Sequence, residues 1–357
     1  MWFKLFICTT DTIYAKRLAG LLDRKYGDKT EVSIFSDIDH LSEYIGEHSV
    51  DILLFGEEFE KEASPERWSC PCAILVNQLY EDTEQGIKKI ARFQRGDKLF
   101  HEILELYSDG GKVKLIHTAS QGGNQGKIYV FAAAAGGVGT STVAKAYAKK
   151  CAVYEKVLYL NFSMLNDQRN NEGQNRGLSD ILIALKSRRD ILSIKLMSSV
   201  METEDRFYTY AACKNPLELY EMDEENMENL IIKMKALDEY QKIIIDIGTE
   251  LGKTALVLYR MADQLVYIRG KSFVEERKFR RLCEIFQYLE EKEQFHLFRK
   301  MLVYRNKTVK KELTDYQDWN IREVGWIPDL QMEDENAIIA RIAQSDVFDD
   351  MENQYEA

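Results

Sequence analysis

The chain has 357 residues, of which 45% are hydrophobic and 4 are Pro, and its formal net charge is −11. This length exceeds one ordinary core, so the composition predicts two globular domains and excludes a disordered chain. The negative charge argues against nucleic-acid binding through a field of the whole protein, because a phosphate backbone attracts positive surfaces.

Residues 1–8 are apolar but too short for a secretory signal, and no run approaches the roughly 20 apolar residues that a membrane span needs. The 6 Cys are scattered, and the closest pair, Cys70 and Cys72, lacks the spacing of a zinc site. We therefore expect a cytoplasmic protein with free thiols and no direct membrane insertion.

The first segment, residues 1–117, alternates short apolar runs with amphipathic stretches. Strands are predicted at residues 3–9, 32–35, 50–55, 72–76 and 90–93, and helices at 12–24, 41–45 and 98–107. Alternating strands and helices predict a parallel sheet that is covered by helices on both faces.

This order of elements resembles a response-regulator receiver domain, which has a flavodoxin-like fold. A receiver carries its phospho-accepting Asp directly after the third strand, where this chain has Gly56. Asp11 matches the acidic site of a receiver but is expected to be a helix N-cap. Residues 93–95 stand where a receiver has its Lys, and none of them is Lys. The segment therefore resembles a receiver-shaped docking module that is not phosphorylated.

Residues 118–126 are rich in Gly, Ser, Asn and Gln and predict a flexible linker. The second domain, residues 127–357, again alternates. Strands are predicted at residues 128–132, 157–160, 242–246, 264–268, 300–304 and 323–327, and helices at 143–152, 178–185, 227–240 and 273–289. This pattern predicts a doubly wound α/β sheet whose ligand lies at the carboxyl ends of its strands.

A Gly-rich loop connects the first strand of this domain to its first helix. In such a loop the backbone N–H groups surround phosphate oxygens, and the following helix adds its positive end. A hydroxyl in the first helical turn can bind Mg²⁺. The predicted nucleotide-binding residues are Gly136, Gly137, Val138, Gly139, Thr140, Ser141 and Thr142.

The loop resembles the deviant Walker A box of the ParA/MinD superfamily, which implies ATP and Mg²⁺ as cofactors. The signature Lys and the usual P-loop Lys of that family are replaced here by Ala135 and Thr140. Loss of both charges weakens stabilisation of the phosphoryl-transfer transition state, so we expect at most a slow ATPase. Lys127, Lys145, Lys149 or another basic group could substitute for them, although Lys145 is expected to be a solvated helix residue.

Other landmarks of that family can be placed by position. Asp246 ends an apolar strand and resembles a Walker B Asp, so Ser141 and Asp246 are the predicted metal residues. Asn306 resembles a strand-end Asn that reads adenine, and Pro328 resembles a loop residue that packs on the base. Where the family has carboxylates after its second strand, this chain has the neutral Asn161 and Ser163, which is a second reason to expect slow hydrolysis. No catalytic residue is assigned.

Two charged stretches bear on partners. Arg277, Lys278, Arg280 and Arg281 cluster on a predicted helix, and neighbouring Glu residues favour a solvated face over a contact with another subunit. Residues 346–352 are acidic, unlike a MinD-type membrane helix, and an anionic leaflet would repel them.

The domain order and the altered loop together resemble the TadZ/CpaE group of pilus-assembly proteins. The resemblance implies an ATP-binding homodimer that organises Tad/Flp pilus machinery at the cell pole or at an inner-membrane complex. Its partners would be pilus secretion or assembly proteins, or polar localisation factors, bound through the receiver-like domain. Two alternatives stay open: an active ParA/MinD-type ATPase in DNA or cell-division positioning, and a nucleotide-free scaffold.

Overall fold

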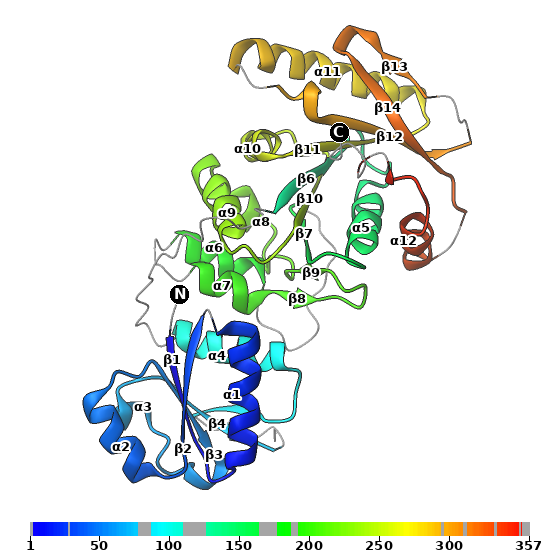
Figure 1. Cartoon of the computed structure of the whole chain (residues 1–357). Helices are drawn as coiled ribbons and strands as arrows, with labels where there is room; N and C mark the ends of the chain where they lie inside the picture. Colours follow the sequence, from blue (N-terminus) through cyan, green and yellow to red (C-terminus); the bar gives the residue numbers. More distant parts are fainter. Residues whose placement is uncertain are drawn as a thin grey trace. The chain divides into compact units, whose positions relative to one another are not determined.

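The computed structural model describes residues 3–27, 29–77, 87–109, 126–163, 177–186, 192–293, 296–309, 313–331, 334–349 and 351 (Figure 1). The chain divides into two compact units. The first contains residues 1–121 and 187–199, and the second contains residues 122–186 and 200–357. Of the predicted linker, residues 118–126, only Gly126 lies within the described residues.

The first unit is built on a five-stranded parallel sheet with the order β2-β1-β3-β4-β5, the order of flavodoxin-like folds. Its strands are β1 (Phe3–Cys8), β2 (Thr30–Phe35), β3 (Ile52–Gly56), β4 (Cys72–Val76) and β5 (Lys88–Ala91). Its helices include α1 (Thr12–Tyr26), α2 (Ile38–Glu47), α3 (Pro65–Trp68) and α4 (Gly96–Asp109). The fold class predicted for the first domain is confirmed.

Side chains alternate between the two faces of this sheet, as the two-residue period of a strand requires. Phe3, Leu5 and Ile7 of β1 pack with α1 and α4, whereas Phe6 and Cys8 pack with α2 and α3. Each face therefore has its own apolar core.

Helix α7 (Leu192–Ser199) also belongs to the first unit, although the sequence analysis assigned residues 127–357 to the second domain. It packs against α4, and the Ile194 side chain lies fully buried in the same core as Leu5. The first core is thus completed by a helix that comes late in the chain.

The second unit contains a nine-stranded sheet with the order β13-β14-β12-β11-β6-β10-β7-β9-β8. Its parallel strands are β6 (Lys127–Ala132), β7 (Val157–Asn161), β9 (Tyr208–Thr209), β10 (Lys242–Gly248), β11 (Gln264–Arg269), β12 (Met301–Thr308) and β14 (Ile321–Pro328). Two short edge strands are antiparallel to their neighbours: β8 (Met201–Glu202) pairs with β9, and β13 (Asp315–Tyr316) pairs with β14.

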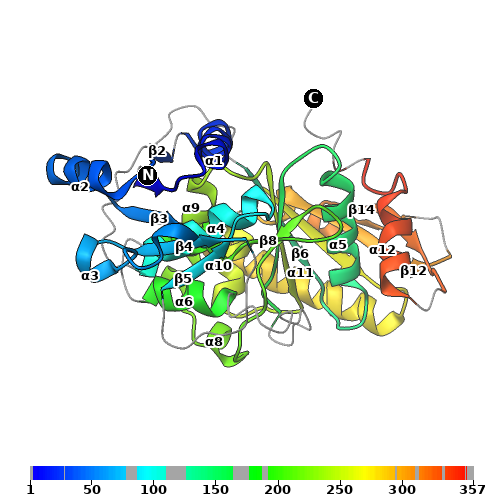
Figure 2. The same ribbon diagram turned by 90° about the horizontal axis from the view of Figure 1, so that it is seen from below.

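Helices cover both faces of this sheet, which confirms the predicted doubly wound architecture (Figure 1). On one face, α5 (Thr140–Cys151) and α12 (Glu335–Ala343) lie side by side (Figure 2). The remaining helices are α6 (Leu178–Lys186), α8 (Leu217–Tyr220), α9 (Glu224–Ala236), α10 (Lys253–Met261) and α11 (Phe273–Glu293).

The acidic carboxyl-terminal stretch contributes to the core beside α5. The Phe348 ring is fully buried, with its centroid 5.1 Å from that of Tyr147 and 6.0 Å from that of Tyr304. Met351 is fully buried as well. Within the described residues, no helix is both long and apolar enough to span a bilayer.

Candidate nucleotide-binding site

The Gly-rich loop lies between β6 and α5 and has the backbone that its glycines permit. Gly137 has a φ of 77° and Gly139 a φ of 90°, in the left-handed region that side chains disfavour. Gly139 caps α5, whose first turn contains Thr140, Ser141 and Thr142. The amino end of this helix is thus directed at the loop and favours an anion there.

The two predicted metal residues lie near each other. Asp246 lies in β10, the strand next to β6, and the nearby Ser141 hydroxyl lowers the pKa of its carboxyl group. The Asp246 carboxylate also accepts from the Tyr159 hydroxyl and from the Gly248 N–H, both at 3.1 Å. Full burial raises the pKa of Asp246 above its ordinary value, and these hydrogen bonds oppose that rise.

A hydroxyl and a carboxylate are hard oxygen donors of the kind that Mg²⁺ prefers. In the part of the chain that the structure describes, no group of three or more His, Cys, Asp or Glu side chains could hold a metal. A P-loop site needs no such cage, because Mg²⁺ keeps several waters and takes its remaining ligands from the phosphates. Ser141 and Asp246 therefore fit a Mg²⁺ ion that accompanies a nucleotide.

Two lysines that could have replaced the lost P-loop charges are held by carboxylates. Lys145 pairs with Glu335 at 3.4 Å, and Lys149 pairs with Asp205 at 2.6 Å. The Lys145 side chain, which the sequence predicted to be solvated, is 17% exposed, and its partner Glu335 is 50% exposed. The packing of α12 beside α5 covers Lys145 and supplies the Glu335 carboxylate.

Another lysine, Lys307, reaches the loop from the end of β12. Its ammonium donates to the carbonyl oxygen of Gly137 at 2.9 Å. Lys307 was not among the residues predicted from the sequence, although it directly follows the predicted Asn306 at a strand end. That adjacency was the available signal.

Asn306 lies against the loop as well. Its side-chain N–H₂ donates to the carbonyl oxygen of Val138 at 2.8 Å, and its side-chain oxygen accepts from the Lys307 N–H at 2.8 Å. The residue is buried. Pro328 is exposed at the end of β14, in register with Thr308 of β12. Recognition of adenine by Asn306 and Pro328 stays a prediction.

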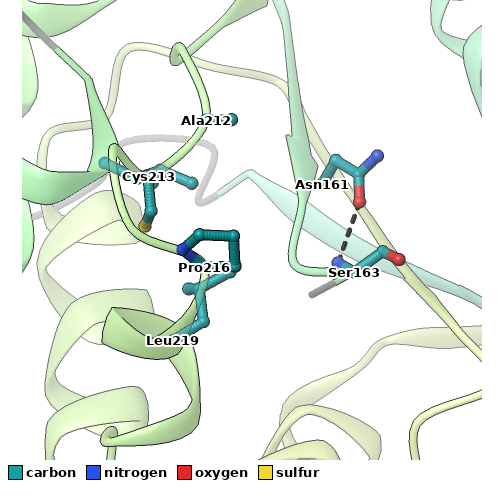
Figure 3. Close-up of a pocket in the computed structure, with 7 residues that line it drawn as sticks. Asn161, Ser163, Ala212, Cys213, Pro216 and Leu219 are labelled. Carbon is teal, nitrogen blue, oxygen red and sulfur yellow. Dashed lines mark hydrogen bonds between the residues drawn. The ribbon is translucent and has the colours of Figure 1, made fainter. Parts of the chain in front are cut away.

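The residues that follow β7 border a small pocket beside this site (Figure 3). Its volume is about 20 Å³, room for roughly one water molecule. Asn161 and Ser163 line it together with Cys213 and Pro216, and the Ser163 N–H donates to the Asn161 side-chain oxygen at 2.9 Å. Neither neutral side chain supplies the carboxylate that would accept a proton from an attacking water.

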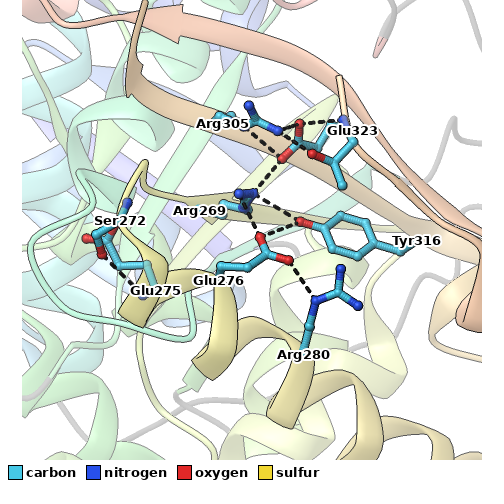
Figure 4. A network of polar contacts seen from close by, with 9 residues as sticks. Arg269, Ser272, Glu275, Glu276, Arg280, Arg305, Tyr316 and Glu323 are labelled. Atoms are coloured by element: carbon cyan, nitrogen blue, oxygen red, sulfur yellow. Dashed lines mark hydrogen bonds and ion pairs between the residues drawn. The ribbon is translucent and has the colours of Figure 1, made fainter. Parts of the chain in front are cut away.

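A buried ion network fixes the end of β12 (Figure 4). Glu323 of β14 is fully buried at its side chain and binds the guanidinium groups of Arg305 and Arg269, each with one contact of 3.0 Å. Arg269 also pairs with Glu276 of α11 at 2.6 Å, and Glu276 pairs with Arg280 at 2.9 Å. Arg305 directly precedes Asn306 and Lys307, so the network positions the strand end that contacts the loop.

The first unit has a second cluster of polar side chains at the carboxyl edge of its sheet. One carboxylate oxygen of Glu58 accepts from the Thr9 hydroxyl at 2.7 Å and from the Thr10 N–H at 2.6 Å. A Cβ on Gly56 would clash with the other carboxylate oxygen. The space in which an acidic side chain at position 56 would begin is therefore filled by Glu58.

Asp11 has the predicted role of helix cap, because its carboxylate accepts from the Tyr14 N–H at 3.0 Å. It also pairs with Arg92 at 2.6 Å. Arg92 directly follows β5, one residue before the stretch in which the sequence analysis looked for a receiver Lys. The last strand thus does bring a cation to this edge.

Residues 1–108 match the family described as "TadZ-like, receiver domain". The amino-terminal domain is therefore similar to the receiver domains of that family. In this TadZ-like domain, Gly56 and Glu58 occupy the place of the receiver phospho-acceptor, and Asp11 with Arg92 forms an internal ion pair.

The chain is also similar to several solved structures. With a ParA family ATPase from Chlorobium tepidum TLS it shares 19% identity, over 62% of this chain and 92% of that chain, with a TM-score of 0.48. With a putative plasmid partition protein from Borrelia burgdorferi B31 bound to AMPPNP it shares 19% identity, over 65% and 97%, with a TM-score of 0.46.

For the MinC:MinD cell division protein complex from Aquifex aeolicus, the identity is 19% over 63% of this chain and 89% of that chain, with a TM-score of 0.43. No curated protein matches the chain.

Proposed function

We propose that this TadZ-like chain binds ATP with Mg²⁺ and hydrolyses it slowly or not at all. The observation that carries the proposal is the loop between β6 and α5, in which Gly137 and Gly139 have left-handed backbones and which leads into the helix turn that places Ser141 near Asp246. Ala135 and Thr140 leave that loop without its own lysines. A ligand that binds one state stabilises that state without being split, so ATP would act as a structural or switching ligand.

Nucleotide that copurifies with the protein tests this proposal directly. We expect ATP, not ADP, after denaturation and chromatography, together with a rise in melting temperature when ATP and Mg²⁺ are added. The Asp246→Asn variant should lose the Mg²⁺-dependent part of that rise. Absence of both bound nucleotide and thermal shift would reject the proposal.

We further propose that the protein forms a homodimer and organises Tad/Flp-type pilus assembly machinery from the cytoplasm. The TadZ-like receiver domain supports this role. Glu58 fills the space where an acidic side chain at position 56 would begin, so we expect the domain to bind pilus assembly proteins or polar localisation factors without being phosphorylated. Deleting the coding sequence should abolish surface pili, and a fluorescent fusion should gather at the cell pole. Normal piliation in the deletion strain would contradict the role.

An active ParA/MinD-type ATPase in DNA or cell-division positioning is the main alternative. It predicts turnover and salt-sensitive DNA binding, both of which the absent lysines and the net charge of −11 oppose. A nucleotide-free scaffold is the other alternative. It predicts that a bulky side chain at Gly139 leaves dimerisation and localisation unchanged.

A further inference from the structure

Asn306 and Lys307 approach the P-loop from the side of its carbonyl groups. The Lys307 ammonium donates to the Gly137 carbonyl at 2.9 Å, and the Asn306 side chain donates to the Val138 carbonyl at 2.8 Å. Two consecutive carbonyls of the loop are thus held by two consecutive residues of β12. We call this pair of contacts the carbonyl clamp.

The clamp determines where the loop's N–H groups point. A peptide unit is planar and trans, so its C=O and N–H bonds point in opposite directions. Holding the Gly137 carbonyl therefore directs the Val138 N–H to the other side, and holding the Val138 carbonyl does the same for the Gly139 N–H. That other side is the side from which a P-loop binds phosphate oxygens.

The backbone at both ends of the clamp requires such support. The clamped peptide units lie between Gly137, with a φ of 77°, and Gly139, with a φ of 90°. Glycine populates many conformations in the absence of contacts, so a loop that contains three glycines has no strong preference of its own. The clamp selects one conformation before any ligand arrives, which lowers the entropy lost on binding.

Lys307 itself has a backbone that favours glycine. Its φ is 56°, in the left-handed region that a long side chain adopts at a cost in free energy. Strain of this kind persists where the surrounding structure compensates for it, and it clusters at ligand sites. At Lys307 the compensating contacts are the ammonium bond to the loop and the N–H bond to the Asn306 side chain.

We propose that Lys307 is a positioning residue that, with Asn306, preforms the phosphate cradle of this altered P-loop. The inference rests on the proposed function and deepens it. It assigns a basic residue to the loop, acting from the carbonyl side through the orientation of the Val138 and Gly139 N–H groups. The ligand class is a nucleoside di- or triphosphate, because the cradle serves phosphates that ADP and ATP share.

The test compares the affinities of the full-length wild type and variants for ATP, ADP and adenosine by calorimetry. Lys307→Met keeps the aliphatic stem and removes the ammonium, so it should weaken ATP and ADP binding alike. A charge-assisted hydrogen bond corresponds to roughly a tenfold change in affinity. Lys307→Arg should restore most of the affinity, and adenosine binding should not change.

The Lys307→Gly variant distinguishes the loss of the clamp contact from a loss of overall stability. Glycine accepts the left-handed backbone at this position, so the variant should melt at or above the wild-type temperature while it loses nucleotide affinity. Lys253→Met is the matched control, because Lys253 is highly exposed and pairs with Glu224 at 3.6 Å. Its affinities should equal those of the wild type.

Hydrogen exchange of the nucleotide-free protein tests the clamp without a ligand. Amides of residues 137–139 should exchange several-fold faster in Lys307→Met than in the wild type. Unchanged exchange and unchanged affinity would overturn the inference, and a loss confined to ATP would overturn it in favour of a direct contact with the γ-phosphate. If the wild type binds no nucleotide, the proposed function fails, while exchange still decides whether the clamp holds the loop.

Discussion

Replacing Glu323 with Gln should destabilise the second unit by about 3 kcal/mol, because it leaves a positive charge uncompensated in a buried network. The wild-type side chain is fully buried and contacts Arg269 and Arg305. With Glu276, which pairs with Arg269 at 2.6 Å, the four side chains sum to zero charge. The variant carries one excess positive charge among groups that are at most 18% exposed.

The magnitude follows from the cost of breaking a buried pair, which is about 3 to 5 kcal/mol when one partner is removed. Gln has the shape of Glu and can still accept one hydrogen bond from a guanidinium, so the lower end of that range applies. The matched control is Glu284→Gln, which makes the same chemical change in an exposed pair with Arg281. Exposed pairs contribute about 0.5 kcal/mol or less.

Urea unfolding of the full chain, followed by circular dichroism and tryptophan fluorescence, measures the difference. At a slope of about 3 kcal/mol per molar urea, the midpoint of the second unit should fall by about 1 M. The control should shift by less than about 0.2 M on the same slope. A Glu323→Gln midpoint within the range of the control would refute the reasoning that these charges depend on one another.

Three further changes test other parts of the structure. Gly139→Val should abolish the thermal shift by ATP, because φ is 90° and a Cβ would lie 2.5 Å from the Asn306 amide nitrogen; Gly136→Ala, where a Cβ meets nothing within 4 Å, should retain it. Phe348→Ala should cost about 3 to 5 kcal/mol in urea unfolding, because the ring is fully buried, whereas Tyr154→Ala, at a residue that is 92% exposed, should change stability by less than about 0.5 kcal/mol. Burial raises the pKa of Glu58, but hydrogen bonds from Thr9 and Thr10 outweigh it and leave that pKa below its ordinary value. A depressed carboxyl pKa stabilises the fold above the unfolded pKa and loses that effect as pH falls through the folded value. The melting temperatures of wild type and Glu58→Gln should therefore differ at pH 7 and converge below about pH 4. A difference that does not change with pH would show that the ionised Glu58 carboxylate is not its source.

The sequence by itself determined the local architecture of the site. A strand period of two residues, a run of glycines and an Ala-rich helix suffice to place the loop, since each is a property of neighbouring residues. The nearness of Ser141 and Asp246 could also be predicted from the sequence, because adjacent parallel strands bring their carboxyl ends to one edge. For the same reason, Gly56 directly after the third strand already indicated an altered receiver.

Only the tertiary structure decided which distant residues complete each site. Lys307 contacts Gly137, which lies 170 positions earlier in the sequence. The Glu58 side chain lies beside Gly56 because of the turn after β3, and hydrophobic periodicity does not predict the direction of a turn. Ile194 is buried in the core of the first unit, although the segments on either side of residues 187–199 belong to the second. Helical and strand periods reveal which face of an element is apolar, but not which partner covers it. That choice depends on shape and charge complementarity between segments, which exist only after the chain has folded.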